Sequence, residues 1–389
     1  HSYGHNNRHN TPKTCGAYNR QHDHTSFIDN NIQTLISLFS FLWWCMRMFD
    51  GELLLRFFDP IFRCERNYGF ASSQFLVTHI IASAFNATGR PGFEFLREGL
   101  SSSNEFVRKF SALGIGFALR GSGDSEAIEV LQNFISRFRG SINDDSYVYG
   151  FEGLGLVLQG HDDALEYFKP FFNAGNEFWI ASLFDGLALA YQGLCDGAIL
   201  DLLKNKVEKG LLNYLGPDIE RAIFDIGLVY RGSRDFSLLR LLKPFFKAKY
   251  DEGYRAAAAY ASSLIFERSG NEDVFDLFKP LFWDFTEVRT AVAVATSILF
   301  RDLGDDALDV LLPLERYKVW GAHVAASLGL GSALLGTANS DALFLIKKFL
   351  RSSVEETKHF AGLALSDLYY RMGDNVFDDL VFMIDNDSC

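Results

Sequence analysis

A unit of two helices separated by a glycine recurs along this chain of 389 residues. In the clearest copy, residues 288–314, an arginine opens a helix of small and β-branched residues, Gly304 ends it, and an apolar helix runs into Pro313. The same glycine recurs at intervals of 32 to 39 residues, at Gly89, Gly121, Gly160, Gly193, Gly232, Gly270, Gly304, Gly336 and Gly373. A period of about 35 residues is typical of helical repeats, so the sequence predicts an all-α solenoid or closed toroid of about eight to nine helix pairs.

The two helices of each unit differ in composition. The first helices are rich in glycine and alanine, as at residues 111–119, 151–158, 185–191, 256–264 and 325–335. Because glycine within a helix costs up to about 1 kcal/mol relative to alanine, its repeated use indicates first helices that approach closely in an inner layer. The second helices carry phenylalanine, leucine and tyrosine, so we expect them to form a bulky outer layer.

The anchor glycines predict the backbone at the end of each first helix. Glycine adopts a left-handed φ without a Cβ penalty and often ends helices for that reason. We therefore expect helix C-termini, several with positive φ, at Gly121, Gly160, Gly232, Gly270 and Gly304.

Lys-Pro pairs recur in the second helices at Pro170, Pro244 and Pro280, and Pro313 is the fourth member of the series. Proline removes a hydrogen-bond donor and clashes with the preceding turn, so each should end or kink its helix. The apolar pair after each Lys-Pro should then pack beneath the next repeat. The second helices after Gly121 and Gly193 lack the proline and should be straighter.

Composition and charge narrow the classes of partner. Apolar residues make up 48% of the chain and charged residues 22%, which is a globular composition. A net charge of −12 argues against nucleic acid and favours basic or hydrophobic protein partners. The five scattered cysteines include no CxxC pair, which indicates a reducing compartment, cytoplasmic or nuclear. The sequons at Asn86 and Asn386 would matter only in a secreted protein.

Three regions follow one another along the chain. Residues 1–30 predict a disordered tail, whose histidines and Cys15 match no closed metal motif. Residues 31–70 predict an apolar helical cap, because the uncharged run before Arg47 is shorter than the roughly 20 residues that cross a bilayer. Residues 71–389 form the repeat domain. The chain begins without methionine and stops within a helical pattern, which is typical of a fragment, a processed form or part of a larger subunit.

A cation recurs just inside the first helices. It is expected to bond the preceding turn or an acid of the neighbouring repeat, with Glu220, Glu287 and Glu356 as candidates. The cations are Arg108, Arg221, Arg255, Arg289 and Lys358.

Three consecutive repeats place an acid after a phenylalanine in the first helix: Glu152, Asp185 and Asp225. Stacking the repeats would align these acids into a row of carboxylates facing a cavity, suited to a basic partner or a cation. The alternative is structural, because acids near helix N-termini suit the helix dipole. Like charges repel, so we expect at least one of the three to point elsewhere.

Motifs for chemistry are absent from the sequence. It contains no P-loop, no GxGxxG before a helix, no HExxH, no GxSxG and no paired-cysteine metal motif. The glycine-rich stretches at Gly150 and at residues 327–332 fall within predicted helices. His161, His323 and His359 are isolated. The sequence therefore predicts no enzyme activity, no cofactor and no metal site.

Two passages carry a resemblance to a known family. They are SALGIGFALRGSGDSEAIEVL from Ser111 and ASSLIFERSGNEDVFDLFKPLF from Ala261. Their pattern of small-residue helix, glycine turn and apolar helix resembles the proteasome/cyclosome repeat, a relative of the HEAT repeat, over about residues 75 to 385. That family includes large scaffold subunits of the proteasome regulatory particle and of the anaphase-promoting complex. The resemblance implies a two-layered toroid that docks other subunits, ubiquitin receptors or ubiquitin-like shuttles without chemistry of its own.

The chain also departs from that family, because its repeat lengths vary and it lacks the large flanking helical regions. No binding residue of the family matches a motif here. Three hypotheses therefore stand: a noncatalytic scaffold for protein subunits, a structural protein that stacks end to end into a filament or shell, and a HEAT-repeat lyase that holds a prosthetic group in its concave face.

Overall fold

The computed structural model describes residues 82, 85–86, 88–139, 144–173, 177–213, 216–247 and 251–370. The chain divides into two compact units, His1–Ser73 and Gln74–Cys389, and all described residues lie in the second. The predicted tail, the apolar cap and the ninth anchor, Gly373, lie outside the described residues.

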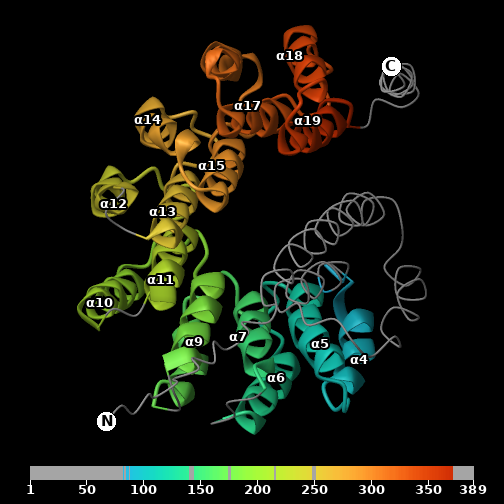
Figure 1. The fold of residues 1–389 in the computed structure, drawn as a ribbon. Coiled ribbons are helices and arrows are strands. Elements are labelled where there is room, and N and C mark those ends of the chain that lie inside the picture. Colours follow the sequence, from blue (N-terminus) through green and yellow to red (C-terminus); the bar gives the residue numbers. More distant parts are fainter. Residues whose placement is uncertain are drawn as a thin grey trace, which may run out of the picture. The chain divides into compact units, whose positions relative to one another are not determined.

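The described residues form an all-α repeat array without strands, as the sequence predicted (Figure 1). The first helices pack consecutively, each against the next, in one curved inner row. They are α5 (Glu105–Ala118), α7 (Ser146–Val157), α9 (Glu177–Ala190), α11 (Gly216–Val229), α13 (Glu252–Ile265), α15 (Thr286–Leu299), α17 (Trp320–Ala333) and α19 (Glu355–Leu368).

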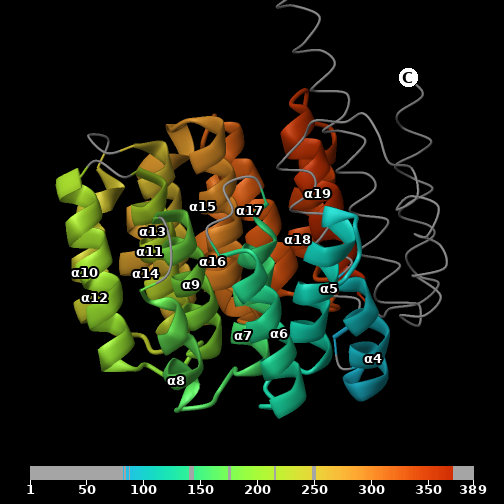
Figure 2. The same cartoon turned by 90° about the horizontal axis from the view of Figure 1, so that it is seen from below.

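The second helices lie outside that row, and Figure 2 shows the two layers from below. They are α4 (Gly89–Gly99), α6 (Ser125–Arg137), α8 (Ala164–Phe168), α10 (Gly197–Asn213), α12 (Phe236–Leu242), α14 (Glu272–Phe278), α16 (Leu308–Leu311) and α18 (Ser340–Leu350). Their large side chains fill the space between the layers, since Phe134, Phe168 and Phe278 are fully buried.

Small residues bring the inner helices into contact along their backbones. A Cβ at Gly116 of α5 would lie 2.6 Å from the Cα of Gly153 in α7, and one at Gly227 of α11 would lie 2.5 Å from the Cα of Ala261 in α13. A Cβ at Gly155 would collide with the carbonyl oxygen of Gly186. The predicted close approach of small-residue inner helices is therefore confirmed.

Each proline of the series ends the α-helical part of its outer element. The chain continues as a 3₁₀ helix at η1 (Lys169–Phe171), η2 (Lys243–Phe246), η3 (Lys279–Trp283) and η5 (Leu312–Arg316). The first apolar residue after each proline is buried, as predicted: Phe171 contacts Trp179 and Phe245 contacts Tyr254 of the next repeat. The rings after these two, Phe172 and Phe246, are half-buried. The outer helices without the proline, α6 and α10, run unbroken for 13 and 17 residues.

Most turns between an inner helix and its outer helix carry two left-handed residues separated by one, whereas the turn after α7 has Gly160 alone. In the turn after α5 they are Gly121 and Gly123, and in the turn after α17 they are Gly336 and Ala338. The first residue donates its N–H to a carbonyl near the end of the next inner helix, as Gly121 does to Leu156 at 2.9 Å. The predicted positive φ is observed at Gly121, Gly160, Gly232, Gly270 and Gly304, and also at Gly89, Gly193 and Gly336.

The anchor glycines are not equivalent, which corrects the repeat register expected from the sequence. Arg268 and Asp302 take the first left-handed position of their turns, with φ of 57° and 59°. They donate to the next inner helix as the first residues of other turns do, so Gly270 and Gly304 occupy the second position. The sequence signal for this register is the Asp or Asn that follows the second position and caps the outer helix. Such caps are Asp124, Asp196, Asp235, Asn271 and Asn339.

Candidate functional site

The predicted acidic row lies on three consecutive inner helices, with Glu152 on α7, Asp185 on α9 and Asp225 on α11. Asp225 is only 2% exposed and Glu152 is also buried, whereas Asp185 is partly exposed. The negative charges of Asp185 and Glu152 both raise the pKa of Asp225. The expectation that at least one of the three points elsewhere stays a prediction.

Two cations join this cluster. Nη1 of Arg221, one helical turn before Asp225 on α11, lies 3.5 Å from Oδ2 of Asp185. Lys206 reaches in from the outer helix α10, and its Nζ lies 5.0 Å from the centroid of the Phe184 ring. Sequence reasoning missed Lys206, because it lies on an outer helix, outside the inner-helix pattern that picked out the acids.

Oδ2 of Asp225 and Nζ of Lys206 have no hydrogen-bond partner among the described residues. Both atoms are buried. Burial is the main reason that the pKa of Asp225 stands well above its ordinary value, and the charge of Asp185 adds to it. Lys206 and Arg221 oppose the shift without cancelling it. The surroundings of Asp225 thus favour the neutral carboxylic acid.

Carboxylates that could share a metal ion lie elsewhere. In the described part of the chain, one group of three ligand atoms lies within 4.8 Å of one another, from Glu105, Asp144 and Asp145. Arg108 pairs with Asp144, and Lys109 pairs with both Glu105 and Asp145. Two cations therefore already compensate this group, and Glu152, Asp185 and Asp225 do not converge as a metal site.

The cations near the start of the inner helices link neighbouring repeats. Nε and Nη2 of Arg255 each lie 2.7 Å from a carboxylate oxygen of Asp284, which precedes α15, and Arg108 pairs in the same way with Asp144, which precedes α7. Arg221 pairs with Asp185, Arg289 donates to the carbonyl of Asp284, and Lys358 pairs within its own helix with Glu355. The expected structural role is thus observed, with partners other than Glu220, Glu287 and Glu356.

A row of polar side chains, missed by sequence reasoning, joins successive turns one residue before the first left-handed position. Nε2 of Gln159 donates to Oε1 of Gln192 at 2.6 Å. Farther along, Glu267 accepts from Arg231 on one side and from Arg301 at 3.1 Å on the other. The two-residue shift of the anchor glycines conceals this row in the sequence. Glu267 and Arg301 lie three residues before their anchor glycines, whereas Gln159 and Gln192 lie one residue before theirs.

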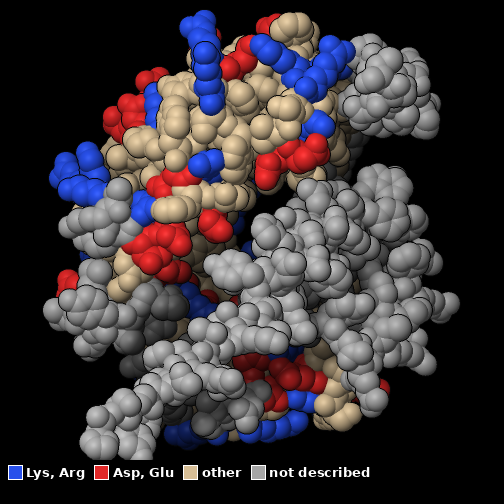
Figure 3. All heavy atoms as spheres, viewed as in Figure 1, with Lys and Arg blue, Asp and Glu red and all other residues tan. Residues whose placement is uncertain are grey.

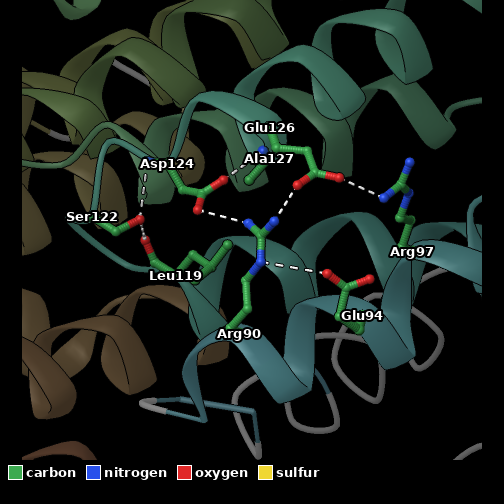
Figure 4. Close-up of polar contacts among 8 residues, drawn as sticks. All are labelled: Arg90, Glu94, Arg97, Leu119, Ser122, Asp124, Glu126 and Ala127. Carbon is green, nitrogen blue, oxygen red and sulfur yellow. Dashed lines mark hydrogen bonds and ion pairs between the residues drawn. The ribbon is translucent and has the colours of Figure 1, made fainter.

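An ion network ties the first two described outer helices, α4 and α6 (Figure 4). Arg90 lies 2.8 Å from Asp124 and also pairs with Glu126, which accepts from Arg97 at 2.5 Å. The side chains of these residues are largely exposed, so each pair contributes little to stability on its own.

Large apolar side chains are exposed at one place where two repeats meet. Trp283, at the end of η3, is 54% exposed and Phe285, at the start of α15, is 62% exposed. Tyr317 of the next repeat lies beside Trp283, with ring centroids 5.4 Å apart. We call Trp283, Phe285 and Tyr317 the aromatic patch. Figure 3 shows charged and other side chains interspersed over the described part of the viewed face.

The histidines considered as possible bases lie apart in three repeats. His161 sits in a turn, with Nε2 3.4 Å from the carbonyl of Gly121, and His323 stacks on Phe349 at 4.7 Å. Burial lowers the pKa of His359. Among the described residues, these contacts join each histidine to structural neighbours rather than to one another.

Together these features define a helical-repeat α-solenoid. No family model matches the chain, and no curated protein matches it. Among solved structures, a Kap121p mutant is similar over 80% of this chain and 36% of its own, with 12% identity and a TM-score of 0.44. An engineered protein is similar over 82% of this chain and 99% of its own, with 16% identity and a TM-score of 0.32. The chain thus spans little more than a third of the Kap121p chain. None of the described helices is long and apolar enough to span a bilayer.

Proposed function

We propose that this protein is a noncatalytic scaffold for other protein subunits, of the proteasome/cyclosome-repeat type, in an assembly resembling the proteasome regulatory particle. The observation that carries the proposal is the aromatic patch. Trp283 is exposed beside the half-buried Tyr317. Tryptophan and tyrosine are enriched at the centres of protein interfaces, where they supply much of the binding energy.

The rest of the molecule supports a scaffold rather than an enzyme. Charged side chains join one repeat to the next at several places, as Arg255 joins Asp284 and Arg231 joins Glu267. A long array built in this way offers edges and surfaces for several partners. The net charge of −12 favours protein over nucleic-acid partners, and the scattered cysteines favour the cytoplasm or nucleus.

The test is affinity purification of the tagged full chain from its native source, followed by mass spectrometry. We expect subunits of a proteasome regulatory particle or of an anaphase-promoting complex to co-purify. They should be lost from the double variant Trp283→Ala and Phe285→Ala. Phe344→Ala is the matched control, because this ring is 74% exposed on the outer helix α18 and is not part of the patch.

The outcomes separate the three hypotheses. Recovery of the chain alone as a large homo-oligomer would favour the filament. A tightly bound prosthetic group in the purified protein would favour the lyase. Equal recovery of partners with the patch variant and with the wild type would reject the aromatic patch as their binding surface.

A further inference from the structure

The cluster around Asp225 joins four helices of three consecutive repeats. Asp185 on α9 and Glu152 on α7 act on Asp225 of α11 through their negative charges, while Lys206 on α10 and Arg221 on α11 itself act through their positive charges. These four charged groups act on Asp225, which completes a cluster of five. Three are acids and two are bases, so full ionisation would leave an excess negative charge inside the array.

The packing around Asp225 gives its ionised form little compensation. Its side chain is 98% buried, and Oδ2 receives no hydrogen bond from the described residues. The nearby ammonium of Lys206 is also buried without a hydrogen-bond partner, over the ring of Phe184. Arg221 pairs with Asp185 instead. A buried carboxylate oxygen without a hydrogen bond is costly, and the group relieves that cost either by holding a proton or by reaching water.

We propose that this cluster is a proton-operated joint: the proton on Asp225 keeps α9, α10 and α11 packed together, and its loss favours a local opening in which the carboxylate reaches water. The joint lies between the third and fourth described inner helices, so its opening would change how the repeats on its two sides are held.

The sign of the pH response follows from the two states of the joint. In the open state Asp225 titrates in the ordinary range near pH 4, whereas in the closed state burial and Asp185 raise its pKa. Between these two pKa values the open state binds fewer protons, so the population of the open state rises by up to about tenfold per pH unit. Above the pKa of the closed state the increase levels off.

The test is hydrogen–deuterium exchange of the full chain between about pH 5 and about pH 9, above the ordinary range of an aspartate, with exchange rates corrected for their intrinsic pH dependence. In the wild type, opening of α9–α11 should rise with pH and then level off, while α15–α17 in the same sample should not respond. Asp225→Asn should abolish the response, because the amide has the same shape and does not titrate.

Two further variants shift the response in opposite directions. Lys206→Met removes a cation that stabilises the ionised form, so the response should level off at a higher pH. Asp185→Asn removes an acid that opposes ionisation, so it should level off at a lower pH. Both variants test the joint even if Asp225→Asn fails to fold.

The matched control is Glu220→Gln. Glu220 lies on the same helix, and burial together with Asp251 raises its pKa as well. This control should leave the response of α9–α11 in place. A response abolished by Glu220→Gln, or retained in Asp225→Asn, would overturn the proposal, as would shifts in the same direction for Lys206→Met and Asp185→Asn.

Discussion

At the scale of single residues, the left-handed positions of the turns are the most restrictive in the array. Glycine fills most of them, but Cys195, Arg234, Arg268, Asp302 and Ala338 also have positive φ. A residue with a Cβ costs about 1 to 2 kcal/mol in this conformation. These residues nevertheless hold the left-handed conformation, because the backbone N–H of each one donates to the neighbouring inner helix.

The turn after α17 tests this cost in both directions. We expect Ala338→Gly to stabilise the protein by about 0.5 to 1 kcal/mol, since relief of strain exceeds the entropy that glycine adds to the unfolded chain. Gly336→Ala should destabilise it, because the new Cβ would meet the carbonyl of Tyr370 at 2.8 Å as well as a φ of 71°. Gly121→Val should cost more than about 1 kcal/mol for the same backbone reason. Urea unfolding followed by circular dichroism measures all three, and equal stability of the Gly336 and Ala338 variants would refute the strain.

At the scale of elements, backbone contact between inner helices depends on missing side chains. Gly155→Ala should cost about 1 to 3 kcal/mol, because its Cβ would strike the backbone of Gly186 and the helices would have to separate. Gly362→Ala is the control: it lies within α19 with nothing within 4 Å of the added Cβ. That change should stabilise the protein by up to about 1 kcal/mol through helix propensity. Thermal unfolding of the two variants should therefore move in opposite directions, and a loss of stability in Gly362→Ala would contradict the explanation.

The 3₁₀ segments after the prolines make a second prediction at this scale. Phe282→Ala should cost about 3 to 5 kcal/mol, because this ring is fully buried against Tyr317 and leaves a cavity. Phe285→Ala, three residues away, should change stability by less than about 0.5 kcal/mol, because the ring is exposed. The denaturation midpoints of the two variants measure the difference, and similar midpoints would show that the 3₁₀ segment does not anchor the next repeat.

The same elements show how far the sequence could lead. Proline and glycine limit the backbone locally, so the ends of the α-helical segments at Pro170, Pro244 and Pro280 and the positive φ values could be predicted from these residues alone. The register could not, because either left-handed position accepts a glycine and the helix-capping Asp or Asn was left out of the pattern. Lys206 was missed for another reason: its role comes from tertiary contact between α10 and α11, for which periodicity within the inner helices gives no signal.

At the scale of the whole molecule, bonds from turn to turn hold the repeats in order. Glu267 shows this best, since its carboxylate accepts from arginines of the repeats before and after it. Burial raises the pKa of Glu267, but the hydrogen bond and charge of Arg231 outweigh it, so the net pKa lies below the ordinary value. The ionised form is therefore favoured in the folded array.

Glu267→Gln should lower stability by about 1 kcal/mol at neutral pH, because it removes the anion between the two arginines. A group with a depressed folded pKa contributes stability that is present above its unfolded pKa and is lost as the pH falls through the folded pKa. The difference between wild type and variant should thus shrink as the pH falls below the ordinary range of a glutamate, about pH 4, and through the lowered pKa of the folded state. Chemical denaturation at several pH values measures it, and a difference that persists in acid would assign the effect to packing instead of charge.

The turns also bond in one direction along the chain. Each of these turns donates backbone N–H groups to carbonyls near the end of the next inner helix, as Gly193 donates to Leu228 of α11 and Gly232 to Leu264 of α13. On a ribosome, where the chain emerges from its N-terminus, a finished turn therefore presents free donors to the helix that is still being made. When the next inner helix forms, the donors for its last carbonyls are already held in position by the preceding turn. The array can therefore fold one repeat at a time in the order of synthesis.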